Sequence, residues 1–304
     1  MTALALYNSF NHAGWLDGLS RDDRGQIDIV FGDIRDPGFV SELAVGHSHI
    51  AHLAALIAIP YSYTAPASYL ETNVIGTLNV LEAARRAGSE RVIHTSTSEV
   101  YGSAQYVPID ENHPIIGQSP YSASKIGADQ VAHSFFASFG LPVVTLRPFN
   151  SYGPRQSQRA FIPSTIVQLL AGRSEIQLGS LAPTRDLTFV TDTARGFADV
   201  LESDRGAGQT FNMGSGFEVS MQEVFETLCS IAGRSPRVAV DARRVRPELS
   251  EVERLWSDSS RIFEVFSWAP TRVGLDGLRS GLEATYEWFA RHPGTGYSSA
   301  DYVV

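Results

Sequence analysis

The chain has 304 residues, of which 43% are hydrophobic and 19% are charged, and its formal net charge is −9. A chain of this length and hydrophobicity buries a large core, which argues against intrinsic disorder. The acidic balance argues against nucleic acid as a partner, because binding to a phosphate backbone requires a basic surface.

Cysteine content and hydropathy further narrow the class of protein to which the chain can belong. Cys229 is the only cysteine, so no disulfide forms within the chain. No apolar run approaches the ~20 residues of a membrane helix, and residues 1–6 are too short and uncharged for a signal peptide. We therefore expect a soluble, cytoplasmic protein without a membrane partner.

Short strands alternate with helices in the first half of the chain. Strands are predicted at residues 3–6, 27–31, 49–53, 91–96 and 141–147. Helices are predicted at residues 68–87 and 121–139, and each is followed by a glycine suited to capping it, Gly88 or Gly140. This alternation predicts right-handed βαβ units, and therefore an α/β fold with a Rossmann-like, doubly wound parallel sheet.

After Tyr152 the elements become shorter and more mixed. Helices are predicted at residues 162–171, from Asp192 onward, and at residues 220–232 and 275–289; strands are predicted at residues 176–178, 187–190 and 209–212. Residues 237–254 read as an arginine-rich loop. We predict a first domain at residues 1–154 and a smaller α/β substrate-binding domain at residues 155–304, with the strands within 187–212 returning to the first sheet.

One part of a dinucleotide-binding sheet is not found in this sequence. Such a sheet opens with a strand, a glycine-rich turn and a helix whose N-terminus holds the pyrophosphate. No such turn precedes the first βαβ unit, since Gly214-Ser215-Gly216 lies too far downstream. The sequence thus predicts that the first strand and its glycine loop are missing, which exposes the edge of a neighbouring strand.

Tyr121 and Lys125 form the strongest candidate for a catalytic pair. They lie four residues apart on a predicted helix, so their side chains share one face, and Lys125 is the only lysine of the chain. A nearby cation favours the phenolate form of tyrosine, which acts as a base.

A second candidate site follows the strand at residues 91–96. Thr97, Ser98 and Glu99 come directly after it, at the carboxyl end of the strand, where open α/β sheets bind their ligands. The carboxylate of Glu99 beside hydroxyl groups suits proton abstraction from a substrate carbon. In contrast, His47, His49 and His52 have a spacing that fits no metal-ligand pattern, so we predict no metal site.

From about residue 3 to residue 289 the chain resembles the extended short-chain dehydrogenases of the NAD-dependent epimerase/dehydratase family. The motifs that carry this resemblance are Gly32-Asp33-Ile34-Arg35-Asp36, His52-Leu53-Ala54-Ala55, Thr72-Asn73-Val74-Ile75-Gly76-Thr77, Tyr121-x-x-x-Lys125, Arg147-Pro148-Phe149-Asn150-Ser151-Tyr152-Gly153-Pro154 and Arg185-Asp186-Leu187-Thr188-Phe189-Val190-x-Asp192.

The resemblance implies a role for each matching residue. Thr97, Ser98, Glu99, Tyr121 and Lys125 are the implied catalytic residues. The implied NAD contacts, within residues 1–154, are Asp33, Ile34, Ala54, Ala55, Asn73, Tyr121, Lys125 and Pro148. Asn150, Arg185 and Arg246 are the implied contacts to a nucleotide-diphosphate sugar, since arginine binds phosphate through forked, charge-assisted hydrogen bonds. The family also implies a homodimer formed through the helices at 68–87 and 121–139.

Within the family, Thr97-Ser98-Glu99 resembles the triplet of 4,6-dehydratases, and residues 7–11, 59–63 and 246–252 look similar to those of the legionaminic-acid type. Two positions depart from the family pattern. Ser98 stands where many dehydratases place an aspartic acid, and Asn8 is nearest the place of the ribose-binding acid. The alternatives are a nucleotide-sugar 4-epimerase, a UDP-glucuronate decarboxylase, or a truncated, cofactor-deficient binding or assembly subunit.

Overall fold

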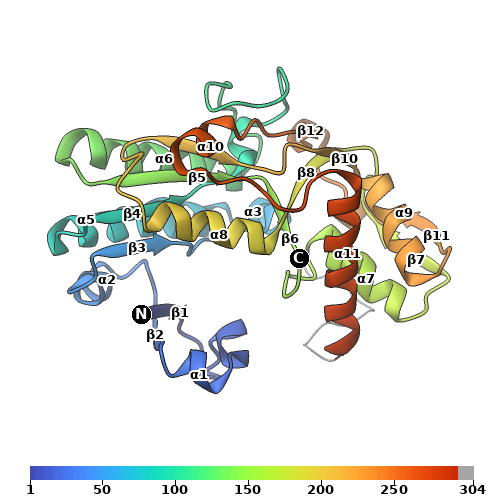
Figure 1. Cartoon of the computed structure of the whole chain (residues 1–304), viewed down its shortest axis with the longest axis horizontal. Coiled ribbons are helices and arrows are strands. Elements are labelled where there is room, and N and C mark those ends of the chain that lie inside the picture. The colour runs from blue at the N-terminus through green and yellow to red at the C-terminus, as the bar shows by residue number, and fades with distance from the viewer. Residues whose placement is uncertain (294–304) are drawn as a thin grey trace.

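The computed structural model describes residues 1–293, and its central feature is a parallel sheet of four strands (Figure 1). The strands lie in the order β3 (His49–His52), β4 (Arg91–Thr95), β5 (Val143–Pro148) and β9 (Thr210–Met213). Nearly every residue of β4 and β5 is buried, as is typical of strands covered on both faces. All neighbouring pairs in this sheet are parallel, in agreement with the predicted α/β class.

Helices cover both faces of this sheet. α5 (Gly76–Ala87) and α6 (Pro120–Phe139) pack on one face, and α8 (Val190–Leu201) and α10 (Ser260–Phe266) pack on the other. Val92 of β4 lies in one apolar cluster with Leu81 of α5, whereas its neighbour Ile93 lies in another with Val200 of α8. Successive side chains of a strand point to opposite faces, so β4 contributes to both layers of the core.

Strands β1 (Thr2–Leu6) and β2 (Asp28–Gly32) form a separate parallel pair. Helix α2 (Pro37–Ala44) packs on α5 and joins this pair to the rest, in a cluster that also contains Leu4 of β1 and Ile50 of β3. Among residues 1–293 no strand pairs with both β1 and β3 to join this pair to the main sheet. Figure 1 shows the pair of β1 and β2 standing apart below β3. The predicted sheet is therefore divided at this point.

The long helix α6 begins and ends at local sequence signals. Ser119 and Ser122 form a reciprocal capping box at its start, with Pro120 in the first turn, and Gly140 ends it with a φ of 69°. The helix predicted at 68–87 consists of α4 (Pro66–Tyr69), a π-helical turn at Leu70–Ile75 and α5, which ends at Gly88. The short helices α1 (Arg21–Arg24) and α3 (Ile59–Thr64) lie in the loops after β1 and β3.

The second half of the chain builds smaller sheets and their own core. Strand β8 (Thr184–Phe189) pairs with β6 (Asn150–Tyr152), β10 (Glu218–Ser220) and β12 (Arg254–Leu255), and β7 (Glu175–Leu178) pairs with β11 (Arg237–Val240). Helices α7 (Phe161–Leu170), α9 (Met221–Ala232) and α11 (Gly274–Arg291) surround a cluster that includes Ile166, Leu178, Leu228 and Leu282. No helix within residues 1–293 combines the length and apolar character needed to cross a membrane.

Two predictions for this half are corrected by the structure. The strand predicted at 187–190 is part of β8 and does not return to the first sheet, whereas β9 does, by pairing with β5. The reason is that β6, which directly follows β5, supplies a partner for β8. The arginine-rich segment 237–254 is also not only loop, since it begins with β11 and leads into β12. The division of the chain at residues 154 and 155 stays a prediction.

Candidate functional site

The carboxyl end of β4 carries the first group of predicted catalytic residues. A one-turn 3-10 helix, Ser98–Tyr101, follows the strand, and Thr97 caps it by accepting a hydrogen bond from Glu99 N at 3.2 Å. The residues Thr97, Ser98 and Glu99 are all buried. The cap therefore holds a hydroxyl and a carboxylate at the end of the sheet where ligands bind.

Helix α6 brings Tyr121 and Lys125 to the same place. The two side chains lie one turn apart near the start of the helix, and both are buried. The side chains of Tyr121 and Thr97 share a hydrogen bond. Lys125 Nζ donates to Thr95 O at 2.5 Å. The structure thus brings the residues predicted from two separate motifs into one site.

Burial sets the protonation of this site. Burial raises the pKa of Tyr121, the hydrogen bond with Thr97 acts in the opposite direction, and the charge of Glu99 raises it further. Burial also lowers the pKa of Lys125 to about 8. The expected shift of Tyr121 toward phenolate is therefore not found in the free protein, because loss of water around the phenol outweighs the hydrogen bond with Thr97.

Glu99 lies against a cluster of charged side chains from the second half of the chain. Arg246 Nη1 is 3.4 Å from Glu99 Oε2 and 3.9 Å from Glu251 Oε1. Arg185 Nη2 donates to the same oxygen of Glu251 at 3.4 Å. The two guanidinium groups are balanced by two carboxylates in the free protein, and they offer the forked N–H donors that bind a diphosphate.

The predicted residues at the end of β5 come near this cluster through strand pairing, since Asn150 pairs with Leu187, two residues after Arg185 in β8. Pro148 ends β5 and is half-buried, and Asn150 begins β6. The buried Oδ1 of Asn150 has no hydrogen-bond partner within the described residues. Because buried polar atoms are nearly always paired, this oxygen is suited to accept a hydrogen bond from a ligand.

Two predicted cofactor contacts use their side chains inside the protein. Asn73 Oδ1 accepts from Leu56 N at 2.8 Å, and its Nδ2 donates to Leu56 O and Ser124 Oγ at 2.9 Å each. Ile34 packs on Gly76, where a Cβ would lie 2.5 Å from Ile34 Cδ1. Asn73 thus ties the loop after β3 to α6, and Ile34 offers a ligand mainly its backbone.

The remaining predicted cofactor residues lie at the carboxyl ends of β2 and β3. Asp33 pairs with Arg35 through a contact of 2.5 Å between Oδ2 and Nη2, and hydrogen bonding to Arg35 lowers the pKa of Asp33. Ala54 is exposed and Ala55 is half-buried in the loop after β3.

These residues fit one half of a dinucleotide. Tyr121 and Lys125 supply buried polar groups at the reacting end, whereas a pyrophosphate requires a helix N-terminus behind a glycine-rich turn. No strand and turn of this kind lies between β1 and β3 in residues 1–293. Asn8 turns its amide to Leu6 O and His12 O at 3.2 and 2.8 Å. The described residues therefore offer buried polar groups to the reacting end of a dinucleotide, and between β1 and β3 they provide no glycine-rich turn for its pyrophosphate.

Three further residues, not predicted from the sequence, shape the site. Tyr69 is fully buried and meets Tyr121 edge to face, with 6.2 Å between ring centroids. Glu251 pairs with Arg185, and Asp129 lies one turn after Lys125. Of these three residues, only Asp129 could have been predicted from a local pattern, because it lies four residues after Lys125 on the same face of the helix. The other two reach the site through folding alone.

The three histidines near β3 have separate environments. His47 Nε2 bonds to Thr2 Oγ1 and His52 Nε2 to Thr77 Oγ1, each at 2.9 Å, and His49 is exposed. Within the part of the chain that the structure describes, no group of three or more histidine, cysteine or acidic residues is placed to hold a metal ion. These histidines therefore serve packing and hydrogen bonding.

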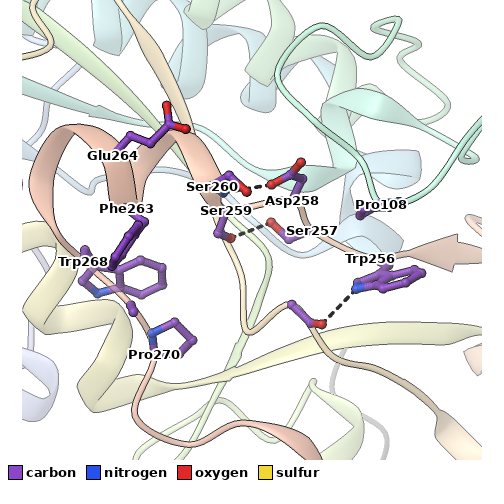
Figure 2. Close-up of a pocket in the computed structure, with 12 residues that line it drawn as sticks. Pro108, Trp256, Ser257, Asp258, Ser259, Ser260, Phe263, Glu264, Trp268 and Pro270 are labelled. Atoms are coloured by element: carbon purple, nitrogen blue, oxygen red, sulfur yellow. Dashed lines mark hydrogen bonds between the residues drawn. The ribbon is translucent and has the colours of Figure 1, made fainter.

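A cavity of about 640 Å³ lies between β12 and α10, away from all predicted site residues (Figure 2). Trp256 Nε1 donates to Gly216 O at 3.0 Å, and the hydroxyls of Ser257 and Ser259 bond at 2.9 Å. The polar groups drawn in Figure 2 are thus largely paired with one another. We assign no part of the reaction to this cavity.

Comparison with known proteins identifies the family. A family model described as GDP-mannose 4,6 dehydratase matches residues 2–280. The chain belongs to this family. The resemblance to NAD-dependent epimerases and dehydratases that its motifs indicated is therefore confirmed, over nearly the whole length of the chain.

Among the similar proteins are 4,6-dehydratases and a 4-epimerase. A dTDP-glucose 4,6-dehydratase of Mycobacterium tuberculosis is 32% identical over 290 residues, which are 94% of this chain and 85% of that protein. A UDP-glucose 4-epimerase of Mycolicibacterium smegmatis is 32% identical over 276 residues, which are 89% of this chain and 85% of the epimerase. The solved structure of DesIV, a dTDP-glucose 4,6-dehydratase of Streptomyces venezuelae with NAD and TYD bound, matches with a TM-score of 0.84 and 32% identity, over 96% of this chain and 88% of DesIV. This last match confirms the Rossmann-like fold class.

Proposed function

We propose that the chain is an NAD-dependent nucleotide-sugar 4,6-dehydratase. The observation that carries this proposal is the meeting of Glu99 with Thr97 and Tyr121 at the end of β4. A dehydratase requires a carboxylate base within reach of the group that takes the hydroxyl proton, because it removes a carbon-bound proton next to the new ketone. Relatives that carry this activity in their names, at 32% identity, support the same conclusion.

The chain's own residues account for the proton transfers. Tyr121 takes the proton of the C4 hydroxyl while Thr97 holds that oxygen. The resulting C4 ketone acidifies the C5 hydrogen, which Glu99 removes. Since Ser98 occupies the place of a separate acid, Glu99 also returns this proton to the C6 hydroxyl, which leaves as water. As C6 is reduced, C5 takes up a proton from solvent, and Tyr121 releases the proton of the C4 hydroxyl to solvent. The product is a 4-keto-6-deoxy sugar nucleotide.

NAD, when bound, supplies the acceptor for the C4 hydride and returns that hydride to C6. The residues that would contact it are Asp33, Ile34, Ala54, Ala55, Asn73, Tyr121, Lys125 and Pro148. The charge of Lys125 favours the phenolate form of Tyr121 during proton transfer.

The substrate diphosphate is assigned to Arg185, Arg246 and Asn150. Arg246 lies 3.4 Å from Glu99 in the free protein, so a diphosphate that engages Arg246 competes for this contact. Substrate binding would then free Glu99 to act as a base, because a carboxylate held by a guanidinium is a weaker proton acceptor.

The decisive test is product analysis of the full chain with NAD in excess. dTDP-glucose and UDP-N-acetylglucosamine are supplied in separate reactions, and the products are measured by mass spectrometry. A dehydratase yields a product lighter by one water molecule. No loss of water from either substrate, under conditions in which the substrate binds by calorimetry, would overturn the proposal.

A 4-epimerase is the second candidate, because the epimerase of Mycolicibacterium smegmatis is as similar as the first dehydratase, at 32% identity. Epimerisation leaves the mass of the sugar unchanged, and a decarboxylase removes carbon dioxide from a glucuronate. Binding of a sugar nucleotide without turnover at saturating NAD would instead indicate a binding or assembly subunit.

The assembly proposed for the chain is a homodimer through the helices within 68–87 and 121–139, acting in the cytoplasm. Leu78 of α5 and Phe139 of α6 are 38% and 57% exposed, which leaves apolar surface for a partner. Sedimentation equilibrium gives the mass in solution, and replacement of Phe139 by glutamate is expected to shift a dimer toward monomer.

A further inference from the structure

Asp129 is a buried carboxylate of α6 with partners on two strands. Its Oδ1 bonds to His94 Nε2 of β4 at 2.9 Å. Its Oδ2 accepts from Ser96 Oγ at 2.8 Å and from Arg147 Nη2 of β5 at 3.0 Å. With 5% of its surface exposed, Asp129 fastens the middle of α6 to the sheet.

The two partners on the β4 side flank the backbone group that holds Lys125. His94 and Ser96 lie on either side of Thr95, whose carbonyl accepts from Lys125 Nζ at 2.5 Å. Because alternate side chains of a strand share one face, His94 and Ser96 both point to α6. Asp129 therefore sets the distance between the helix that carries Lys125 and the strand that leads to Thr97.

Asp129 also acts on Lys125 through its charge. The titratable groups coupled to Lys125 are Asp129 of α6, His52 of β3 and His94 of β4, and Tyr121 lies one turn before Lys125 on α6. Burial lowers the pKa of both histidines, so neither supplies positive charge near neutral pH. Burial lowers the pKa of Lys125 to about 8, and Asp129 opposes that shift.

We propose that Asp129 is a positioning residue, which keeps Lys125 charged and keeps Lys125 and Tyr121 in register with Thr97. The dependence of the reaction on Lys125 rests on the proposed function, whereas the effect of Asp129 on Lys125 does not. The two parts are therefore measured separately.

The single lysine of the chain makes the first measurement direct. Protein labelled with lysine enriched in carbon-13 at Cε gives one lysine signal, and its titration reports Lys125 without cofactor or turnover. In the unsubstituted protein we expect a midpoint near pH 8, as burial and Asp129 together predict. Asp129→Asn keeps the shape and removes the charge, so the midpoint should fall by about one pH unit or more.

Asp192 offers a matched control. It is also buried and also hydrogen-bonded, with Thr271 Oγ1 at 2.8 Å, but it lies at the start of α8. Asp192→Asn is expected to lower stability and to leave the midpoint of Lys125 unchanged. An unchanged midpoint in the Asp129 variant, or an equal shift in the Asp192 variant, would overturn the proposal.

If Asp129→Asn does not fold, the variant Asp129→Glu provides a second test of the proposal. This variant retains the charge and displaces it by one methylene, so the lysine midpoint should stay near that of the unsubstituted protein. With NAD and substrate in excess, kcat should fall about tenfold or more while KM is kept, because the reacting groups are out of register. Unchanged kcat, or a change confined to KM, would contradict the positioning role. If the unsubstituted protein also shows no turnover, the proposed function is refuted, and the lysine titration remains the test of the effect of Asp129.

Discussion

Each side chain proposed to take part in the reaction is withdrawn from water, and this determines its protonation. Thr97, Glu99, Tyr121 and Lys125 are each less than 10% exposed. In such surroundings the neutral forms of phenol and amine are favoured, and a single neighbouring charge has a large effect. The contact between Glu99 and Arg246 is one such pair, and it joins residues 147 positions apart in sequence.

Replacement of Tyr121 by phenylalanine should abolish most turnover. Loss of a positioned acid–base group lowers rates by about 10²- to 10⁴-fold, so kcat should fall in this range while the fold is retained. Tyr152→Phe is the matched control, because Tyr152 is also buried and its hydroxyl donates to Leu278 O, at 3.2 Å. That control should lose about 1 kcal/mol of stability and keep its turnover. Retention of more than a few per cent of activity by Tyr121→Phe, with NAD in excess, refutes its role.

Replacement of Glu99 by glutamine should separate oxidation from elimination. The amide cannot accept the C5 proton, so reduced cofactor should accumulate with substrate and be visible by absorbance. Glu251→Gln is the control, since Glu251 pairs with Arg185 at 3.4 Å without a proposed proton transfer. It should alter KM more than elimination. Normal yields of 4-keto-6-deoxy product from Glu99→Gln would exclude Glu99 as the base.

Among the secondary-structure elements, β3 and β4 are joined by an unusual pair of side chains. His52 and His94 are partners in the parallel register of these strands, and their ring centroids lie 6.1 Å apart. Both are buried, and burial lowers the pKa of each. One bonds to α5 through Thr77 and the other to α6 through Asp129, so the pair ties both helices to the sheet.

This pair predicts how stability depends on pH. Below about pH 6.5 the unfolded chain takes up protons on these histidines that the folded protein refuses. Stability should therefore decrease as pH falls through this window, by about 1.4 kcal/mol per pH unit for each histidine. Urea unfolding between about pH 5.5 and 7.5 measures the slope.

His52→Gln should reduce the change in the free energy of unfolding per pH unit by the contribution of one histidine. His133→Gln, at an exposed position of α6, should leave the slope as it is. A slope that is the same in the His52 variant as in the unsubstituted protein would show that His52 does not titrate as proposed.

At the scale of the whole molecule, the division of the sheet between β1 and β3 is the feature with most consequence. Leu6, the last residue of β1, is 65% exposed, and Leu53 and Ile57, in the loop after β3, are 62% and 65% exposed. Apolar side chains and an unpaired strand edge at one place favour association with another chain. The same place is the carboxyl end of the sheet, where a dinucleotide's pyrophosphate would lie.

We predict that residues 1–304 alone bind NAD weakly. A strand, glycine-rich turn and helix of about 25–30 residues, added ahead of Thr2, would fill the gap and supply a helix N-terminus to the pyrophosphate. Such an extension should tighten NAD binding at least about tenfold and reduce aggregation, as measured by calorimetry and light scattering. The same extension with its glycines replaced by leucine is the control. Tight NAD that co-purifies with the 1–304 chain would contradict this prediction.

Local patterns determined the order of elements and the pairing of Tyr121 with Lys125. Helix periodicity, Gly140 as a cap and the four-residue spacing depend only on neighbours in sequence, so they can be read without a structure. The contact of Arg246 with Glu99, the partners of β8 and the raised pKa of Tyr121 were decided by tertiary structure. Strand pairing and burial depend on segments far apart in the chain, and no local pattern records which of them will meet.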